Sequence, residues 1–323
     1  TQYNGIIKPS DVAYNRYAFA GDHLRNVSLN YQYTFLNTYI YGETSYQLGA
    51  GWATNNGLLC SILPSLSLLG NYRYYHKSYF SPFGQSLQEG SAVANEQGWY
   101  GGLIFHPSRA VEWTNYVDFF SFPSARYRVD KASKGMDMLS QFTYLWYKKA
   151  KLSLRYRYRL KQENSADKND KRLEVVLKHQ LRLDGQHTFS STWRMRSRVE
   201  WAGYRKGVGP QEYGWLFYQD VFWQAPRKLP SLNIRVAYFN TESYNSRIYA
   251  YENDVLYASS FPVYQHQGWR YYINCQWRIC RGLDLWMRYG QFQYLDQTSV
   301  GSGLDWSEGS HRSTVSAQIR WQW

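Results

Sequence analysis

The chain ends in STVSAQIRWQW, where polar and apolar side chains alternate strictly from Thr314 to Trp323. Val315, Ala317, Ile319, Trp321 and Trp323 occupy every second position. A period of two places side chains on opposite faces of an extended strand, so one face of this segment is apolar throughout. A flat and unprotected apolar strand is rare at the edge of a sheet in water. The question that constrains the fold is therefore which solvent this apolar face meets.

The same period recurs in interior segments. Between residues 151 and 161, leucine and tyrosine alternate with serine and arginine, and residues 193–201 and 268–279 follow the same scheme. A helix would distribute the arginines around its circumference, whereas a strand collects them in one row. We therefore expect these segments to be β-strands with one apolar and one basic face.

The connections between the expected strands alternate between short and long. Short connections are expected near Phe35–Asn37, Leu63–Ser65, Pro107–Arg109, Lys148–Ala150, Asp184–Gln186, Ala225–Pro230 and Cys280–Gly282. Long connections are expected near His76–Glu96, Ser121–Lys134, Gln162–Asp170, Gly203–Tyr213, Thr241–His266 and Asp296–Ser310. The short linker Gly49–Gly51 is the exception. Tight turns at one end and long loops at the other are typical of outer-membrane β-barrels, whose turns face the periplasm.

The fold class that we predict is an all-β, transmembrane antiparallel β-barrel of about 16 strands. Fifteen crossings run from Leu24–Phe35 to His311–Trp323, and Tyr14–Ala20 is a candidate sixteenth that would make the number even. Residues 1–23 form a lead-in, and residues 24–323 form the barrel. In hydrocarbon every backbone polar group must be paired within the protein, so the strands would close into a barrel. The apolar strand faces would then meet lipid. The predicted location is the bacterial outer membrane.

Composition agrees with this interpretation. The 323 residues include 32 Tyr and 14 Trp, and the net charge of +13 indicates an anionic solute, an anionic membrane surface or nucleic acid as a partner. No run approaches ~18 consecutive apolar residues, which excludes a transmembrane helix. The first residues, TQYNGIIKPS, lack a charged region followed by an apolar core. A secretion signal was therefore either removed by processing or lies in a longer chain.

Five stretches carry a family resemblance. They are YNRYAFAGDH (14–23), YIYGETSYQ (39–47), GNYRYYHKSYFSPFGQSLQEGSAVANEQGWYGGL (70–103), FPSARYRVDKASKGMD (122–137) and GSGLDWSEGS (301–310). They resemble large outer-membrane barrel proteins of Bacteroidota that carry helix-hairpin-helix segments before the barrel. Those segments are absent from these 323 residues, so the resemblance implies no DNA contact here. It also implies that the chain is the C-terminal portion of a larger barrel, or a barrel that another polypeptide completes.

A basic cluster on the inward face is the strongest chemical feature. It comprises Arg155, Arg157, Arg159, Lys178, Arg182, Arg194, Arg196, Arg198, Arg270 and Arg278. Unpaired cations at this density repel and require anions, water or carboxylates. Three interpretations stay open: a lumen for anionic solutes or a nucleic-acid strand, a lumen whose arginines pair with Glu174, Glu200, Asp220 and loop carboxylates, and contacts to lipopolysaccharide phosphates.

Four tryptophans are candidates for the membrane interface: Trp269, Trp277, Trp321 and Trp323. Aromatic girdles lie at the headgroup level of such barrels. A C-terminal aromatic residue also resembles the signal that outer-membrane assembly machinery reads in barrel proteins. The long loops 76–96 and 241–266 are rich in Tyr, Phe, Ser and Asn, and either form contact surfaces for sugars, peptides or proteins or fold inward as a plug.

Catalytic and metal signals are weak. The seven histidines form no H-x-x-x-H or H-x-H pair. Cys60, Cys275 and Cys280 have no metal spacing and are interpreted as small buried or lipid-facing residues. His187 and a serine share HTFSS, but a dyad needs cross-strand geometry and an orienting group. We expect no enzyme activity, no metal and no cofactor.

Two functions follow. The first is a structural or accessory subunit of an envelope complex for assembly, secretion or uptake. The alternative is an outer-membrane channel with a basic lumen for anionic solutes, and DNA uptake is a weaker variant. The expected partners are outer-membrane lipid and lipopolysaccharide, other envelope proteins, and the outer-membrane assembly machinery during biogenesis, with nucleic acid the weakest candidate.

Overall fold

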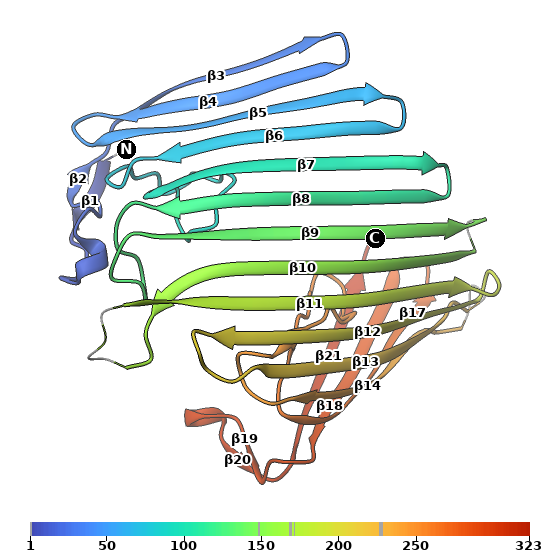
Figure 1. Ribbon diagram of the computed structural model, residues 1–323. Coiled ribbons are helices and arrows are strands. Elements are labelled where there is room, and N and C mark those ends of the chain that lie inside the picture. The colour runs from blue at the N-terminus through green and yellow to red at the C-terminus, as the bar shows by residue number, and fades with distance from the viewer. Residues whose placement is uncertain (1, 148, 168–169, 171, 226–228) are drawn as a thin grey trace. The chain divides into compact units, whose positions relative to one another are not determined.

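One antiparallel sheet of 15 strands dominates the chain (Figure 1). The computed structural model describes residues 2–147, 149–167, 170, 172–225 and 229–323. The sheet strands are β3 (Asn26–Phe35), β4 (Thr38–Gln47), β5 (Gly51–Leu63), β6 (Leu66–Tyr75), β7 (Glu96–Ser108), β8 (Val111–Phe122), β9 (Ser133–Trp146), β10 (Ala150–Asn164), β11 (Leu173–Thr188), β12 (Trp193–Lys206), β13 (Glu212–Trp223), β14 (Ser231–Thr241), β17 (Gln267–Cys280), β18 (Leu283–Tyr294) and β21 (His311–Trp321). They lie in chain order, and the expected all-β antiparallel fold is confirmed.

Short elements complete the structure. The two-stranded sheets are β1 (Gln2–Ile7) with β2 (Gly21–His23), β15 (Ile248–Tyr249) with β16 (Val263–Tyr264), and β19 (Ser299–Val300) with β20 (Ser307–Glu308). The short helices are η1 (Ala13–Asn15) and η2 (Gly303–Asp305). Among the described residues, no helix has the length and apolarity needed to traverse a membrane.

The chain divides into two compact units. Unit 1 comprises Thr1–Gln141, Arg157–Lys178 and Lys206–Gly209, and unit 2 comprises Phe142–Tyr156, His179–Arg205 and Pro210–Trp323. In unit 1 the turns that join β3 to β4, β5 to β6 and β7 to β8 lie at one end of the strands, and β1 and β2 lie near the other end (Figure 1).

The two faces of the strands differ sharply in unit 2. Trp215 and Phe217 on β13 have 43% and 42% of their surface exposed, and Ile234 on β14 has 40%. On the opposite face Asp220 and Arg235 are each 1% exposed, and they are register partners on neighbouring strands. We call the face with the arginines the basic face and the other the apolar face. The sequence period of two predicts this division because alternate side chains point to opposite faces.

Most of the expected connections are confirmed, and one is wrong. The exception at Gly49–Gly51 is present as a three-residue link between β4 and β5. The expected turn at Asp184–Gln186 lies instead within β11, which continues to Thr188. Asp-Gly is a common turn pair, but here Asp184 stays extended and accepts a hydrogen bond at 2.7 Å from Nε of Arg198. The connections at 148–150, 162–170 and 225–230 fall partly outside the described residues.

The candidate sixteenth strand, Tyr14–Ala20, is also wrong. Residues 13–15 form η1, and the chain continues as turns and coil to residue 20. The Asn15 side chain donates to the backbone oxygen of Ser10 at 3.1 Å, a local bond that competes with strand pairing. Phe19 stacks on Phe80 with ring centroids 5.1 Å apart. The aromatic residues of this segment therefore pack on loops rather than forming a strand face.

Candidate functional site

The carboxylate of Glu252 forms the centre of a buried cluster in unit 2. Glu252 lies in the connection of residues 242–266, which we call the inner loop, and no part of its side chain is exposed. Arg270 on β17 donates to it from Nε at 3.0 Å and from Nη2 at 2.8 Å, and Arg288 on β18 forms a further ion pair. The Tyr264 hydroxyl donates to Oε1 at 2.8 Å. Two strands and two parts of the inner loop thus meet at one carboxylate. We call Glu252, Arg270, Arg288 and Tyr264 the Glu252 cluster.

The inner loop is packed as firmly as a core element. Ile248, Ala250 and Tyr264 of the loop are buried together with Leu216 and Phe239 from the basic face of β13 and β14. The ring of Tyr264 meets that of Phe239 edge to face, with centroids 5.5 Å apart. Burying apolar side chains is the main stabilising term in folding, so these contacts hold the loop against the sheet.

Glycine at one strand position lets the loop approach closely. A Cβ atom on Gly214 would lie 2.3 Å from the backbone oxygen of Ser246, a separation that real Cβ atoms do not adopt. Ser246 itself is fully buried. The absence of a side chain on this residue of β13 therefore allows backbone contact between the sheet and the inner loop.

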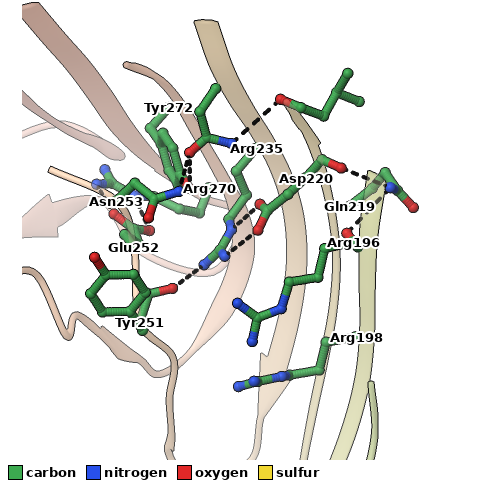
Figure 2. Close-up of polar contacts among 12 residues, drawn as sticks. Arg196, Arg198, Gln219, Asp220, Arg235, Tyr251, Glu252, Asn253, Arg270 and Tyr272 are labelled. Atoms are coloured by element: carbon green, nitrogen blue, oxygen red, sulfur yellow. Dashed lines mark hydrogen bonds and ion pairs between the residues drawn. The ribbon is translucent and has the colours of Figure 1, made fainter. Parts of the chain in front are cut away.

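A second polar group ties the inner loop to β13 and β14 (Figure 2). Arg235 binds Asp220 through Nε at 2.5 Å and Nη2 at 2.7 Å, and its Nη1 donates to the backbone oxygen of Tyr251 at 2.8 Å. Bidentate pairing of this kind is both strong and directional. Asn253 donates to Asn233 Oδ1 at 2.6 Å beside it. The loop is consequently held at Tyr251, Glu252 and Asn253 in succession.

The pKa of Glu252 makes docking of the inner loop sensitive to acid. Burial alone would raise the pKa of this carboxyl, but hydrogen bonds from Arg270 and Tyr264 and the charges of Arg270 and Arg288 lower it below the ordinary value of a glutamate. Burial raises the pKa of the Tyr264 hydroxyl, which therefore stays protonated as a donor. A carboxyl with a depressed pKa in the folded state stabilises it fully above its unfolded pKa, and this contribution is lost as the pH falls through the folded value.

We therefore expect the inner loop to stay docked at neutral pH and to detach progressively as the pH falls through the lowered pKa of Glu252. Pepsin digestion of the detergent-solubilised chain over a series of falling acidic pH values, followed by mass spectrometry, would locate new cleavage within residues 242–266. The Glu252→Gln variant should be cleaved there at every pH of the series. Equal protection of the wild-type loop throughout the series would contradict the assignment.

A second buried cluster lies on the basic face of unit 1. Arg73 on β6 is fully buried, donates from Nε to Glu96 at 2.6 Å, and binds both oxygens of Asp118 at 2.8 and 3.0 Å. A Cβ on Gly98 would lie 2.4 Å from Cζ of Arg73. Because Gly98 on β7 has no side chain, the guanidinium of Arg73 crosses this strand to reach Asp118 on β8. We call these residues the Arg73 cluster.

The loop of residues 76–95 docks on the Arg73 cluster. The backbone N–H of Glu89 donates to Glu96 Oε1 at 2.9 Å, and that of Gly90 donates to Oε2 at 2.7 Å. The Glu89 side chain accepts from Arg159 at 2.8 Å and also binds Lys161. Unit 1 therefore repeats the design of unit 2, in which a long loop lies on the basic face and its carboxylates meet strand cations.

The structure places the predicted basic cluster on one face, but largely in ion pairs. Arg157 and Arg159 meet Asp137, Arg182 meets Glu200, Arg196 and Arg198 meet Asp184, Arg270 meets Glu252, and Arg278 meets Asp284. Arg155 and Lys178 also have interactions within the described chain. Arg194 lies over the ring of Phe222, 4.2 Å from its centroid. A transport role of these residues stays a prediction.

Of the three expected carboxylate partners, Glu200 and Asp220 form arginine pairs. Glu174 instead accepts a hydrogen bond from the Ser165 hydroxyl at 2.9 Å. Sequence reasoning did not identify Glu252, Arg235, Arg288 or Arg73. The sequence did carry a signal for the three arginines, because each of them lies among alternating apolar residues of a strand.

The predicted interface tryptophans lie on the surface. Trp269, Trp277, Trp321 and Trp323 are all exposed, and Trp269 stacks on Tyr271 with interplanar angle 6°. Cys60, Cys275 and Cys280 are free. Among the described residues, no group of three or more His, Cys, Asp or Glu side chains is placed to hold a metal ion.

Comparison with known proteins gives a distant likeness only. No protein-family model and no curated protein sequence matches the chain. The deltaS2 mutant of the TodX monoaromatic hydrocarbon channel is similar at 8% identity and a TM-score of 0.34, over 88% of this chain and 83% of that one. The Pseudomonas putida toluene transporter TodX is similar at 8% identity and a TM-score of 0.31, over 91% and 86%. Likeness at this level assigns neither a family nor a substrate to the chain.

Proposed function

We propose that the chain is an outer-membrane β-barrel that serves as a structural or accessory subunit of an envelope complex, with its own loops occupying the basic face. The observation that carries this proposal is the pairing of the strand arginines with carboxylates, above all Arg270 and Arg288 with Glu252. Cations that are neutralised and covered by a packed loop are poorly placed to line a wide anion path.

The exposed apolar face supports a membrane location. On the neighbouring strands β14 and β17, Ile234 pairs with Ile273 and Val236 pairs with Tyr271. These four side chains lie side by side on one surface, and each is about two-fifths exposed. Soluble monomers rarely expose contiguous apolar patches larger than a few hundred Å². An apolar band of this kind is what membrane barrels present to lipid. Outer-membrane lipid and lipopolysaccharide are therefore the surroundings that we propose.

A polar patch on the apolar face of unit 1 supports a protein partner. Tyr31 donates to Asn56 at 2.8 Å, Asn56 donates to Thr54 at 2.9 Å, and Thr54 shares a hydrogen bond of 2.7 Å with Thr44. These residues lie on β3, β4 and β5. Strand β3 is at the edge of the sheet, and β4 is its one strand neighbour in the described chain. Lipid offers no partner for an edge strand. A second envelope protein, or further strands of a larger barrel, would supply both polar contacts and strand pairing.

Photo-crosslinking in native envelopes tests the proposal. With p-benzoylphenylalanine in place of Thr44, on the polar patch, we expect a covalent adduct with another envelope protein. The matched variant has the same group in place of Val236, which is exposed on the apolar face of β14, and should label lipid instead. Absence of any protein adduct at Thr44 would overturn the accessory role, and absence of lipid labelling at Val236 would overturn the membrane location.

A channel for anionic solutes is the second candidate. It is favoured by Arg194 on β12 and Arg312 on β21, for which the described residues supply no carboxylate within ion-pair distance. Conductance of the wild-type chain in planar bilayers, with anion preference reduced in Arg194→Gln, would favour it over the accessory role. We also retain as a proposal the kinship with Bacteroidota barrels that carry helix-hairpin-helix segments.

A further inference from the structure

A cavity of about 540 Å³ in unit 1 differs in chemistry from the rest of the basic face. It lies between the first strands of the sheet, β3 to β5, and the loop of residues 76–95, which forms its opposite wall. Its volume is within the range of about 300–1,000 Å³ that is usual for small-molecule sites. The cavity is thus large enough for one or two sugar rings.

The lining is nearly uncharged. Among the described residues that line the cavity, Glu43 alone carries a charge, although arginines occupy the same face at β6 and β10. The remaining polar lining consists of amides and hydroxyls, including Asn30, Asn55 and Gln85. These groups select neither an anion nor a cation by charge, and they match a ligand whose polar groups both donate and accept.

Tyrosine rings form the apolar part of the cavity. Tyr39 and Tyr41 on β4 stack on one another with centroids 5.5 Å apart and an interplanar angle of 25°. Tyr41 packs over Gly57 of β5, where a Cβ would lie 2.1 Å from the tyrosine ring. The other side of the cavity contains Tyr75 and Tyr79, which are buried in a small apolar cluster with Ala53 and Val93. Aromatic faces beside hydrogen-bonding groups provide contacts for both the C–H and the O–H groups of a sugar.

The walls are held in place by hydrogen bonds. The N–H of Phe80 donates to Gln47 Oε1 at 2.6 Å, and Asn26 donates to the backbone oxygen of Phe80 at 3.0 Å. The Tyr75 hydroxyl donates to the backbone oxygen of Leu87 at 2.7 Å. A preformed cavity spares the ligand the cost of ordering a loop.

One buried acceptor in the cavity lacks a partner. Oδ1 of Asn55 is inaccessible and accepts no hydrogen bond from the described residues. A buried polar atom without a partner costs about 1–3 kcal/mol, and such atoms in native structures call for an explanation. Rotation of the Asn55 amide toward the cavity, which its side chain lines, would let a ligand hydroxyl supply the missing donor.

We propose that this cavity binds a neutral carbohydrate, with Tyr39 and Tyr41 packing on the ring and Asn55, Asn30 and Gln85 binding its hydroxyls. An organic cation also favours tyrosine and a carboxylate. However, the rings of Tyr39 and Tyr41 stack on each other rather than facing one another across a site, and the Tyr75 hydroxyl is engaged by Leu87. The amides and hydroxyls outnumber the single charge, which favours the sugar. This inference is independent of the accessory role proposed above.

Saturation-transfer NMR and calorimetry on the detergent-solubilised full chain test the inference, with glucose, maltose and cellobiose as neutral probes. Glucuronate and choline are the charged comparisons. We expect millimolar binding of at least one neutral sugar, and roughly fivefold weaker binding in Asn55→Ala, the loss expected for one hydrogen bond. Gln85→Ala, an exposed loop change that leaves the strands intact, should weaken binding in the same direction.

Asn71→Ala is the matched control. Asn71 is also buried on the basic face of the neighbouring strand β6, and its Oδ1 also lacks a partner in the described chain, but it does not line the cavity. Its replacement should leave sugar binding unchanged. Absence of binding to all three neutral sugars would overturn the inference, as would binding of choline or glucuronate alone, or equal losses in Asn55→Ala and Asn71→Ala.

Discussion

Replacing Glu252 with alanine is expected to release the inner loop from the basic face of unit 2 and to create ion conductance. The change leaves Arg270 and Arg288 buried without their carboxylate, and breaking a buried pair in this way costs about 3–5 kcal/mol. It also removes the acceptor of Tyr264. We expect planar bilayers with the wild-type chain to stay silent and those with Glu252→Ala to show frequent openings.

Two comparisons separate the loss of the Glu252 ion pairs from general damage to the fold. Glu308→Ala removes a carboxylate from the exposed strand β20, where the described residues give it no side-chain partner, and should leave the bilayers silent. Glu252→Gln keeps an acceptor oxygen but loses the charge, so its openings should be fewer than those of Glu252→Ala. Wild-type conductance equal to that of Glu252→Ala would show that the docked loop does not obstruct ions, and would favour the channel function.

The strands could be predicted because a strand with one apolar and one polar face has a two-residue period in its sequence. In β10, β12 and β17 apolar residues occupy most alternate positions, and this period is independent of what lies far away in the chain. The errors occurred where local signals conflict with long-range pairing. Asp184 and Gly185 form a common turn pair, yet the bond from Arg198 on the next strand keeps Asp184 within β11.

The sites were predictable in part only. The row of arginines follows from the alternation, and pairing with Glu200 and Asp220 was one of the interpretations that the sequence left open. The role of Glu252 could not be predicted, because the two arginines that bind it lie 18 and 36 residues further along the chain, on two different strands. Nothing periodic marks a loop residue that folds back on a sheet, so the carboxylate that anchors the inner loop had no signal of its own.

The Arg73→Ala variant should show the largest loss of stability in unit 1. The change leaves Glu96 and Asp118 buried side by side without a cation, which costs about 3–5 kcal/mol and adds repulsion between two carboxylates. Urea unfolding in detergent, followed by tryptophan fluorescence, would measure it. Arg172→Ala breaks an ion pair in which the arginine side chain is 86% exposed, and should leave the midpoint unchanged.

Two further variants identify the cause as the unpaired charge. The triple change Arg73→Met, Glu96→Gln and Asp118→Asn removes all three charges together, and should be more stable than Arg73→Ala because no buried ion is left uncompensated. Gly98→Ala retains every charge but places a Cβ within 2.4 Å of Cζ of Arg73, so the guanidinium must withdraw from Asp118. A loss in Gly98→Ala, together with recovery in the triple variant, would show that the loop of residues 76–95 depends on one arginine crossing β7. Equal unfolding midpoints for the triple variant and Arg73→Ala would instead assign the loss to the missing guanidinium hydrogen bonds, because methionine retains most of the side-chain volume.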